Sequence, residues 1–542
     1  MSLTTAGVCP GRSRVVCGVV ARALILYACA SAAAAAHDWP SYNRTPTGER
    51  FSALKQINTS NVSELRVLCT YDTGVKTSFQ SGLIEVRGVI YGTTEMDTFA
   101  LDASDCAQKW RVHEDYTPAS NLHVNRGAAY LDGRLYRGTE DGRVLAYDAG
   151  TGRRLWAVQI ADPAHSETVP AAPLAWNGMV FVGNAGGDNK GVKGRIYALD
   201  ARSGRILWVF YMVPKDREQA FALGWFNAPD APITGGATWT TYTLDPESRL
   251  LYVPGGNAAP DFDKSLRGGD NLFTNSVVAL DSRTGKLSAH YAVTPADFHD
   301  WDESTAPALI TTKSGKQLLA VSAKDGFLHG FELRSRHEVY KTPVTEIQNE
   351  DVPLSPMPVH FCPGTQGGSE WNGPAYDPQQ NLIFTGAVQW CETVALAPSA
   401  QTLSTPLFTP WTGNSDPQHA FGTFDPMSSW AGWIYATDAD TGVVVWKRKM
   451  PFPVLSGVTP TAGGLVLVGD IGGTQYALDA ATGSVLWSGN LGGAIGGGVI
   501  TYDHRGSQRI AVALGMTSSI WPTQQTTAKV SILALSDGAA SH

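Results

Sequence analysis

One unit recurs along the chain and constrains its fold more than any other feature. A strand-like run ends in an acidic residue, a turn that mostly contains Gly follows, and an aromatic residue comes eight positions after the acid. The Asp binds backbone donors of the turn and the Gly accepts a positive φ, so each copy predicts a hairpin. Copies end at Trp110, Trp156, Trp208, Trp446 and Trp487, a copy at Asp281 lacks the Trp, and a degraded copy runs from Glu332 to Tyr340.

The spacing of these copies predicts how the hairpins assemble. Where no insertion intervenes they recur about every 40–50 residues, which is enough for four short strands. A sheet of that size buries its faces by stacking radially on its neighbours, as in a β-propeller. A β-solenoid or two sandwiches would fit this period less well. Seven copies and one irregular region, roughly 345–430, predict an all-β, eight-bladed β-propeller in a single domain over 37–542.

The first 36 residues have the pattern of a secretory signal peptide. Arg12, Arg14 and Arg22 precede a short apolar run and then small residues, with cleavage expected at Ala36–His37. The apolar run is shorter than the about 20 residues of a spanning helix, so no transmembrane segment is expected in the mature chain. We therefore expect a periplasmic or secreted protein. The alternatives are a lipid anchor on Cys29 and the poorly ordered N-terminus of a cytosolic protein.

The number of cysteines is consistent with an exported protein. Cys69, Cys106, Cys362 and Cys391 remain after the signal peptide, and an even number in an oxidising compartment suggests disulfides. Three pairings are open, and Cys69–Cys106 with Cys362–Cys391 are the local choices. The chain has no Cys-x-x-Cys-His motif for a c-type haem and no close Cys/His cluster for zinc. A net charge of −8 argues against nucleic acid or an anionic membrane as a partner.

Motifs between the repeats carry a family resemblance over nearly the whole mature chain. In order they are Asp38-Trp-Pro-Ser-Tyr, Val124-Asn-Arg-Gly127, Gly191-Val-Lys-Gly194, Gly235-Gly-Ala-Thr-Trp239, Gly255-Gly-Asn257, Asp300-Trp-Asp302, Lys324-Asp-Gly326 and Gly493-Ala-Ile-Gly496. This series resembles the pyrroloquinoline quinone (PQQ)-dependent alcohol dehydrogenases of the methanol/ethanol dehydrogenase family. The resemblance implies oxidation of an alcohol by hydride transfer to PQQ. Because the chain has no haem of its own, electrons would pass to a soluble cytochrome c.

The resemblance also assigns residues to the quinone. Arg126 suits a forked bond to a carboxylate, although an ordinary surface Arg needs no such role; in the family an Arg here binds a carboxylate of PQQ. A purely structural role is the ordinary expectation for a tryptophan such as Trp239. In the family, the Trp at this position forms the floor on which the quinone stacks. Lys324 matches the cation that bonds the reactive oxygens. The remaining matches are Asn372 and Gln80, which stands where the family has a Glu.

A calcium ion is the second implied cofactor. Asp188, Asn257 and Asp302 offer the oxygen ligands that calcium prefers, although each alone suits a turn. The loop holding Asp188 is one residue longer than in the family, so Asn189 is the alternative ligand. Asp302 also matches the general base, with His299 and Asp300 nearby. Ser304 stands where lanthanide-using relatives carry another Asp, which favours calcium.

Several positions depart from the family pattern. Ser120 and Asn121 replace an adjacent cysteine pair, and Pro170 and Ala185 replace two polar contacts. Leu455 replaces a substrate-pocket Trp, which would widen the pocket and favour an alcohol larger than methanol, or a polymeric one. The competing interpretation is a non-catalytic PQQ-like propeller scaffold of the cell envelope. A calcium-dependent hydrolase is a third, and it lacks a recognisable nucleophile.

Overall fold

The computed structural model describes residues 37–536, so the predicted signal peptide and Cys29 lie outside the described residues. Strands dominate this range. No helix within it is long and apolar enough to cross a membrane. The helical elements are all short: α2 (Arg217–Ala222), α3 (Ser399–Leu403), η1 (Val62–Glu64), η2 (Pro163–His165), η3 (Lys264–Leu266) and η4 (Pro417–His419).

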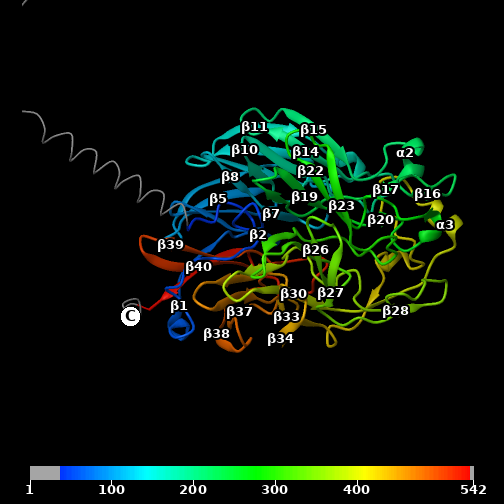
Figure 1. Cartoon of the computed structure of the whole chain (residues 1–542). Helices are drawn as coiled ribbons and strands as arrows, with labels where there is room; N and C mark the ends of the chain where they lie inside the picture. The colour runs from blue at the N-terminus through cyan, green and yellow to red at the C-terminus, as the bar shows by residue number, and fades with distance from the viewer. Residues whose placement is uncertain (1–36, 537–542) are drawn as a thin grey trace, which may run out of the picture.

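Eight four-stranded antiparallel sheets occur within residues 37–536, and they follow one another along the chain (Figure 1). The first four are β3 (Ile84–Val86), β4 (Val89–Thr93), β5 (Asp97–Asp102), β6 (Gln108–His113); β8 (Ala129–Leu131), β9 (Arg134–Gly138), β10 (Arg143–Asp148), β11 (Arg154–Gln159); β12 (Leu174–Trp176), β13 (Met179–Gly183), β14 (Arg195–Asp200), β15 (Ile206–Tyr211); and β18 (Thr243–Asp245), β19 (Leu250–Pro254), β22 (Ser276–Asp281), β23 (Leu287–Ala292). The next three are β24 (Ala308–Thr311), β25 (Gln317–Ser322), β26 (Phe327–Glu332), β27 (Glu338–Pro343); β29 (Ala375–Asp377), β30 (Leu382–Gln389), β33 (Ala431–Asp438), β34 (Val444–Met450); and β35 (Thr459–Thr461), β36 (Leu465–Gly469), β37 (Thr474–Asp479), β38 (Val485–Asn490).

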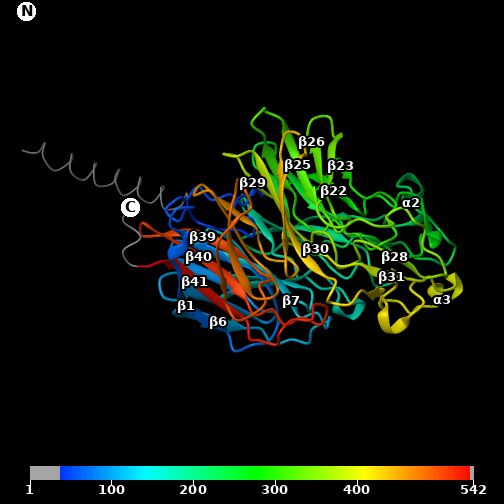
Figure 2. The same cartoon turned by 90° about the horizontal axis from the view of Figure 1, so that it is seen from below.

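The last sheet joins the two ends of the described chain. It contains β39 (Val499–His504), β40 (Ser507–Leu514) and β41 (Lys529–Leu535), and its outermost strand is β1 (Leu65–Asp72), which pairs with β41. Both views show β1 beside these C-terminal strands (Figures 1 and 2). The predicted disulfide Cys69–Cys106 is present and ties β1 to the turn between β5 and β6 of the neighbouring sheet.

The repeat has the structural role that its residues indicate. Trp156 at the end of one copy donates from Nε1 to the carbonyl of Ala201 in the next sheet, at 3.2 Å. Its ring lies on Gly204, where an added Cβ would approach within 2.9 Å and where φ is +75°. Asp200 of the same turn accepts hydrogen bonds from the backbone and hydroxyl of Ser203. Trp110, Trp208 and Trp446 make the same contacts, and Tyr340 replaces the tryptophan against Gly442.

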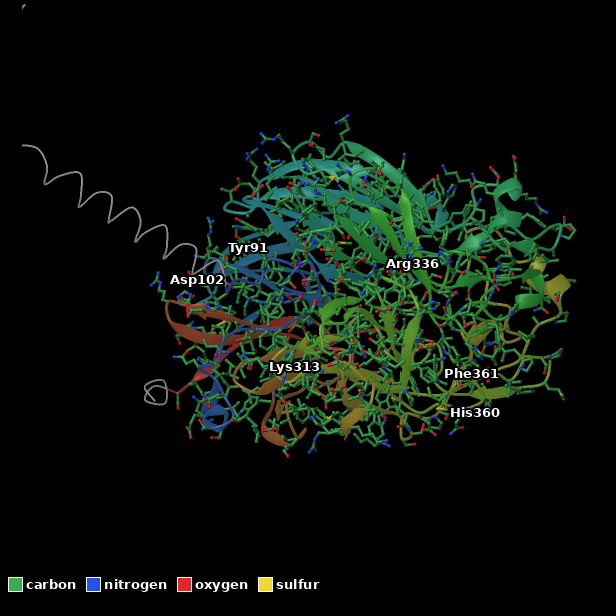
Figure 3. All side chains as sticks on the ribbon, viewed as in Figure 1. Tyr91, Asp102, Lys313, Arg336, His360 and Phe361 are labelled. Atoms are coloured by element: carbon green, nitrogen blue, oxygen red, sulfur yellow. A yellow bond between two sulfur atoms is a disulfide. The ribbon has the colours of Figure 1, made fainter. Side chains whose placement is uncertain are left out.

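Side chains fill the interior of the molecule (Figure 3), and many of the buried ones form apolar clusters that draw on neighbouring sheets. Val144 of β10 and Val180 of β13, for example, belong to one buried apolar cluster, and Leu101 of β5 and Ile532 of β41 belong to another. The all-β propeller expectation is therefore confirmed.

The irregular region 345–430 contributes β29 and β30 to a sheet and also carries a separate three-stranded sheet. That sheet is β28 (Val359–Phe361), β31 (Glu392–Val394) and β32 (Thr423–Phe424), and the predicted Cys362–Cys391 disulfide joins the ends of β28 and β31. α2, α3 and β28 lie on the same side of the molecule in both views (Figures 1 and 2). The remaining strands form pairs: β2 (Ser78–Gly82) with β7 (Val124–Gly127), β16 (Phe226–Asn227) with β21 (Arg267–Gly268), and β17 (Thr234–Gly235) with β20 (Ala258–Ala259).

Candidate functional site

The topology of the sheets brings the predicted site residues to one face. In a four-stranded antiparallel sheet, the connection between the second and third strands lies at the same end as the connection to the next sheet. Asp188 lies between β13 and β14, and Lys324 lies between β25 and β26. Asp302 lies between β23 and β24, which belong to neighbouring sheets. Residues far apart in sequence therefore meet at this face.

An ion pair links Lys324 and Asp302 at this face. Lys324 Nζ lies 2.8 Å from Asp302 Oδ2 and 3.8 Å from Asp300 Oδ2. The other oxygen of Asp302 accepts a hydrogen bond from the backbone N–H of Asn257 at 2.9 Å. Burial opposes the charged ammonium, but the two carboxylates outweigh it and raise the pKa of Lys324. The lysine is therefore held as a cation beside a carboxylate whose two oxygens are both engaged.

Three carboxylates gather beside this ion pair in the arrangement of a cation site. One oxygen each from Asp188, Asp261 and Asp300 lies within 4.8 Å of the others. Asn257 joins them by donating from Nδ2 to Asp261 Oδ1 at 2.9 Å. Asp261 Oδ2 and Asp300 Oδ1 are buried and have no hydrogen-bond partner among the described residues. Buried oxygens of this kind are the ligands that calcium takes in proteins, so the donor set fits a hard cation.

The pKa values of the three carboxyl groups reflect their crowding. Burial, and after it the charge of Asp302, raises the pKa of Asp188 to about 6. Burial raises the pKa of Asp261 and Asp300 well above the usual range, and neighbouring carboxylates raise both further. Several like charges in one buried site repel one another, and a divalent cation removes that repulsion.

A cation and two tryptophans define the next part of the site. The guanidinium of Arg126, on β7, lies 4.5 Å from the ring centroid of Trp239 and 5.0 Å from that of Trp371. Its Nη1 donates to the carbonyl of Trp239 at 3.1 Å, whereas its buried Nε has no partner among the described residues. Burial lowers the pKa of Arg126 to about 10. Lys324 Nζ lies 5.6 Å from the same Trp239 ring, so this ring connects the arginine with the ion pair.

The other predicted quinone contacts, Gln80 and Asn372, are buried, and each side-chain amide makes only some of the hydrogen bonds that it could make. Gln80 donates to Ser78 Oγ, and the Asn372 amide donates to the carbonyls of Gly386 and Val454. The side-chain carbonyl oxygens of both residues have no partner among residues 37–536.

The sequence motifs did not identify three residues as members of the cation site or of the quinone site. Asp261 and Asp300 belong to the carboxylate cluster, and no local motif distinguishes Asp261 from a loop residue. Glu370 is buried within electrostatic reach of Lys324 and Arg126, and burial raises its pKa to about 7 against the influence of Lys324. Two residues that the sequence offered as alternatives have other contacts. Asn189, the alternative metal ligand, donates to the carbonyl of Gly186 in its own loop. The ring of His299, near the predicted base, stacks on that of Trp301 with the centroids 4.0 Å apart.

The positions that depart from the family pattern lie around the same face. Leu455 is fully buried in an apolar cluster with Trp371, and Trp239 packs against that cluster. The carbonyl of Pro170 accepts a hydrogen bond from the backbone N–H of Arg126 at 2.8 Å. Asn121 is exposed on the segment that leads into β7.

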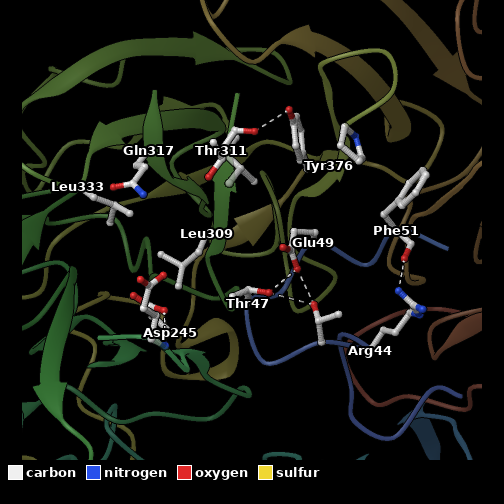
Figure 4. Close-up of a pocket in the computed structure, with 14 residues that line it drawn as sticks. Arg44, Thr47, Glu49, Phe51, Asp245, Leu309, Thr311, Gln317, Leu333 and Tyr376 are labelled. Carbon is white, nitrogen blue, oxygen red and sulfur yellow. Dashed lines mark hydrogen bonds between the residues drawn. The ribbon is translucent and has the colours of Figure 1, made fainter. Parts of the chain in front are cut away.

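A surface pocket lies at the opposite end of the sheets (Figure 4). Its volume is about 410 Å³, and Thr311 and Gln317 line it at the turn between β24 and β25. β25 runs from this pocket to Ser322, close to Lys324, so the length of a strand separates the pocket from the site. Thr45 and Thr47 donate to Glu49 at its rim. The pocket is therefore not part of the candidate site.

The protein is a β-propeller with a buried, highly charged site at one face. Comparison with known proteins shows the family to which it belongs. The sequence model described as glucose/ethanol/alcohol dehydrogenase, beta-propeller domain, matches residues 39–360. That match covers more than half of the chain and includes Arg126, Trp239 and Lys324. The chain belongs to the PQQ-dependent alcohol dehydrogenase family.

Individual relatives agree with this assignment. The quinohemoprotein alcohol dehydrogenase ADH-IIG of Pseudomonas putida is 31% identical over 80% of this chain and 66% of its own length. The lanthanide-dependent methanol dehydrogenase of Methylacidiphilum fumariolicum (strain SolV) is 29% identical over 86% of this chain and 82% of its own. The solved structure of ADH-IIG from Pseudomonas putida HK5 superposes with a TM-score of 0.84 at 26% identity, covering 93% of this chain and 81% of that one. This chain thus spans about two thirds of the length of ADH-IIG.

A second sequence model, described as outer membrane protein assembly factor BamB, matches residues 431–530. This stretch contains two copies of the repeat, which end at Trp446 and Trp487, and none of the predicted cofactor, metal or catalytic residues. The match therefore lies on the structural repeat and not on the predicted site.

Proposed function

We propose that the protein is an exported PQQ-dependent alcohol dehydrogenase built as one domain of eight blades over 37–542. One observation carries this proposal. The Lys324–Asp302 ion pair, the Arg126–Trp239 contact and a carboxylate cluster with unpartnered oxygens lie together at one face. Packing alone requires none of these buried polar groups, and burying them without partners is costly.

The residues fit both cofactors of the family. Arg126, with an unpartnered buried Nε, would bind a carboxylate of PQQ, and Trp239 would support its flat ring system. Lys324, Gln80 and Asn372 offer further polar contacts. Asp188, Asn257, Asp261 and Asp300 would hold the calcium ion beside Asp302. When bound, PQQ supplies two-electron oxidation of an alcohol carbon and the cation supplies Lewis-acid polarisation.

The chain's own groups have separate tasks in this reaction. Asp302 accepts the hydroxyl proton of the alcohol as a general base, which contributes about 10²–10⁴-fold. Lys324 lies within bonding distance of that carboxylate and stabilises negative charge that develops near it. Burial of both groups excludes water and strengthens these interactions.

Substrate, acceptor and location follow from other features. Leu455 stands where the family resemblance places a substrate-pocket Trp, and its smaller side chain favours an alcohol larger than methanol. The sequence has no haem-binding motif, so electrons leave to a separate soluble cytochrome c. The signal-peptide pattern of residues 1–36 supports a periplasmic location.

Titration with PQQ in the presence of calcium tests the proposal. We expect an absorbance change that saturates at one quinone per chain, followed by alcohol-dependent reduction of an artificial dye. Asp302→Ala should abolish dye reduction and retain the bound quinone, whereas Arg126→Ala should weaken quinone binding. Saturable quinone binding without activity on primary, secondary or polymeric alcohols would overturn the catalytic part. Absence of both would favour the scaffold interpretation.

A further inference from the structure

A second group of metal-binding side chains lies at the same face, between the first two sheets. Glu95 lies in the connection between β4 and β5, and Glu140 lies in the connection between β9 and β10. His123 lies between β6 and β8, immediately before β7. One ligand atom from each residue lies within 4.8 Å of the other two, and His123 Nδ1 is 2.9 Å from Glu95 Oε2.

The two carboxylates are incompletely bonded. Glu140 is 2% exposed, and its Oε1 accepts a hydrogen bond from the backbone N–H of Val124 at 2.8 Å. Its Oε2 is buried and has no partner among the described residues, and the same is true of Glu95 Oε1. Buried acceptors without a donor cost free energy, so these oxygens require a cation or a water. The nearby guanidinium of Arg137 does not supply the donor, because it bonds to the backbone carbonyls of Gly138, Asp97 and Glu95.

We propose that Glu95, His123 and Glu140 bind a divalent transition metal of the zinc class, separate from the calcium site. An imidazole nitrogen with two carboxylate oxygens is a donor set that zinc accepts at about 2.0–2.2 Å, whereas calcium prefers oxygen alone. The His123 side chain is half exposed, which leaves room for a water as a further ligand. The three donor atoms already lie within 4.8 Å of one another, so small side-chain movements would bring them around one ion.

The metal would add a further link between three segments that already contact one another. Val124 and Ala119 both donate backbone hydrogen bonds to Glu140, so the segment before β7 already lies against this residue. Arg126, two residues beyond Val124, makes the contact with Trp239. Metal binding would therefore fix the segment that replaces the family's cysteine pair, beside the quinone-binding arginine.

Calorimetric titration with Zn²⁺ tests the site. Purified protein is stripped with a chelator and then kept in excess Ca²⁺, so that the oxygen-only site is filled. We expect one Zn²⁺ per chain with micromolar or tighter affinity. His123→Ala and Glu140→Gln should each weaken binding at least tenfold, and His165→Ala, which alters another half-exposed histidine beside an Asp, should leave it unchanged.

Folding of each variant is checked by its near-ultraviolet circular dichroism. Because His123 is half exposed, its replacement should leave the fold intact even where the buried Glu140 variant does not fold. No zinc uptake by the unaltered protein, or equal uptake by His123→Ala, would overturn the proposal. Neither result would bear on quinone binding, which is measured separately by absorbance.

Discussion

The ammonium of Lys324 lies 2.8 Å from Oδ2 of Asp302, and the opposite oxygen of that carboxylate accepts the N–H of Asn257 at 2.9 Å. The lysine and the backbone thus hold Asp302 from both sides. Lys324 also lies over the same tryptophan ring as Arg126. One residue therefore connects the proposed base with the proposed quinone platform.

Two substitutions of Lys324 distinguish the effect of its charge from the effect of its size. Lys324→Met should lower kcat of the PQQ- and calcium-loaded protein by about 10²–10³-fold, the cost of removing one stabilising group from an active site. Lys324→Arg keeps the charge and should lose less. Dye-linked alcohol oxidation measures the effect, with quinone content determined by absorbance. Equal kcat for Lys324→Met and the unaltered protein would contradict this role.

Asp261 provides a test of the cation site that family motifs do not suggest. Asp261→Asn removes one of three crowded carboxylates, so calcium affinity should fall at least tenfold because affinity depends on the number of charged ligands. Since bound cation stabilises the folded state, the calcium-dependent rise in Tm should shrink. Thermal unfolding with and without Ca²⁺ checks this. The control is Asp245→Asn at the opposite end of the sheets, which should respond to calcium like the unaltered protein.

His329 should make stability depend on pH. It is fully buried, with Nε2 2.9 Å from Asp325 Oδ2 and Nδ1 2.6 Å from Glu338 Oε1. Burial opposes its charge, but these carboxylates raise its pKa to about 9. A raised folded-state pKa stabilises fully below the unfolded value of about 6.5, and the contribution, on the order of 3 kcal/mol, is lost as pH rises through about 9.

Guanidinium unfolding at several pH values measures this contribution. The free energy of unfolding of the unaltered protein should fall across that window, and His329→Gln should lack this part of the fall. Comparing the two proteins removes the contribution of other titrating groups. Parallel pH profiles for both would show that His329 is not responsible.

The repeat tryptophans should contribute to stability through both packing and hydrogen bonding. Trp156→Phe loses the Nε1 bond to Ala201 and should cost about 1 kcal/mol. Trp156→Ala also leaves a cavity against Gly204 and should cost about 3 kcal/mol. Val443→Ala, at an exposed position, should change stability by less than about 0.5 kcal/mol. Chemical unfolding measures all three, and equal stability of the Phe and Ala variants would refute the packing contribution.

Sequence patterns predict well what local chemistry determines. The Asp200 turn and the positive φ of Gly204 follow directly from the repeat, because turn residues act on their own backbone. The stacking of Trp156 on the next sheet follows from the number of residues between copies. The disulfide pairs also agree with the local choices.

In the candidate site, sequence motifs identify some of the residues and miss others. Motifs pointed to Asp188, Asn257 and Asp302, and the structure places them beside one another. Asp261 and Glu370 have no motif, since their importance comes from what distant segments bring to them. The predicted quinone contact of Asn372 stays a prediction, and the structure adds Glu370, two residues earlier, as a buried acid within reach of Lys324 and Arg126.

The pairing of β1 with β41 has a consequence for biosynthesis. Leu65 pairs with Leu535, so the last sheet cannot be completed until nearly all of the polypeptide has been made and, if it is exported, translocated. Asp188 and Lys324 are synthesised long before that pairing forms. We therefore expect cofactor loading to be a late event in the life of each molecule. Loss of the final strand would leave β1 without a partner and turn β40 into an unpaired sheet edge, which is a template for aggregation.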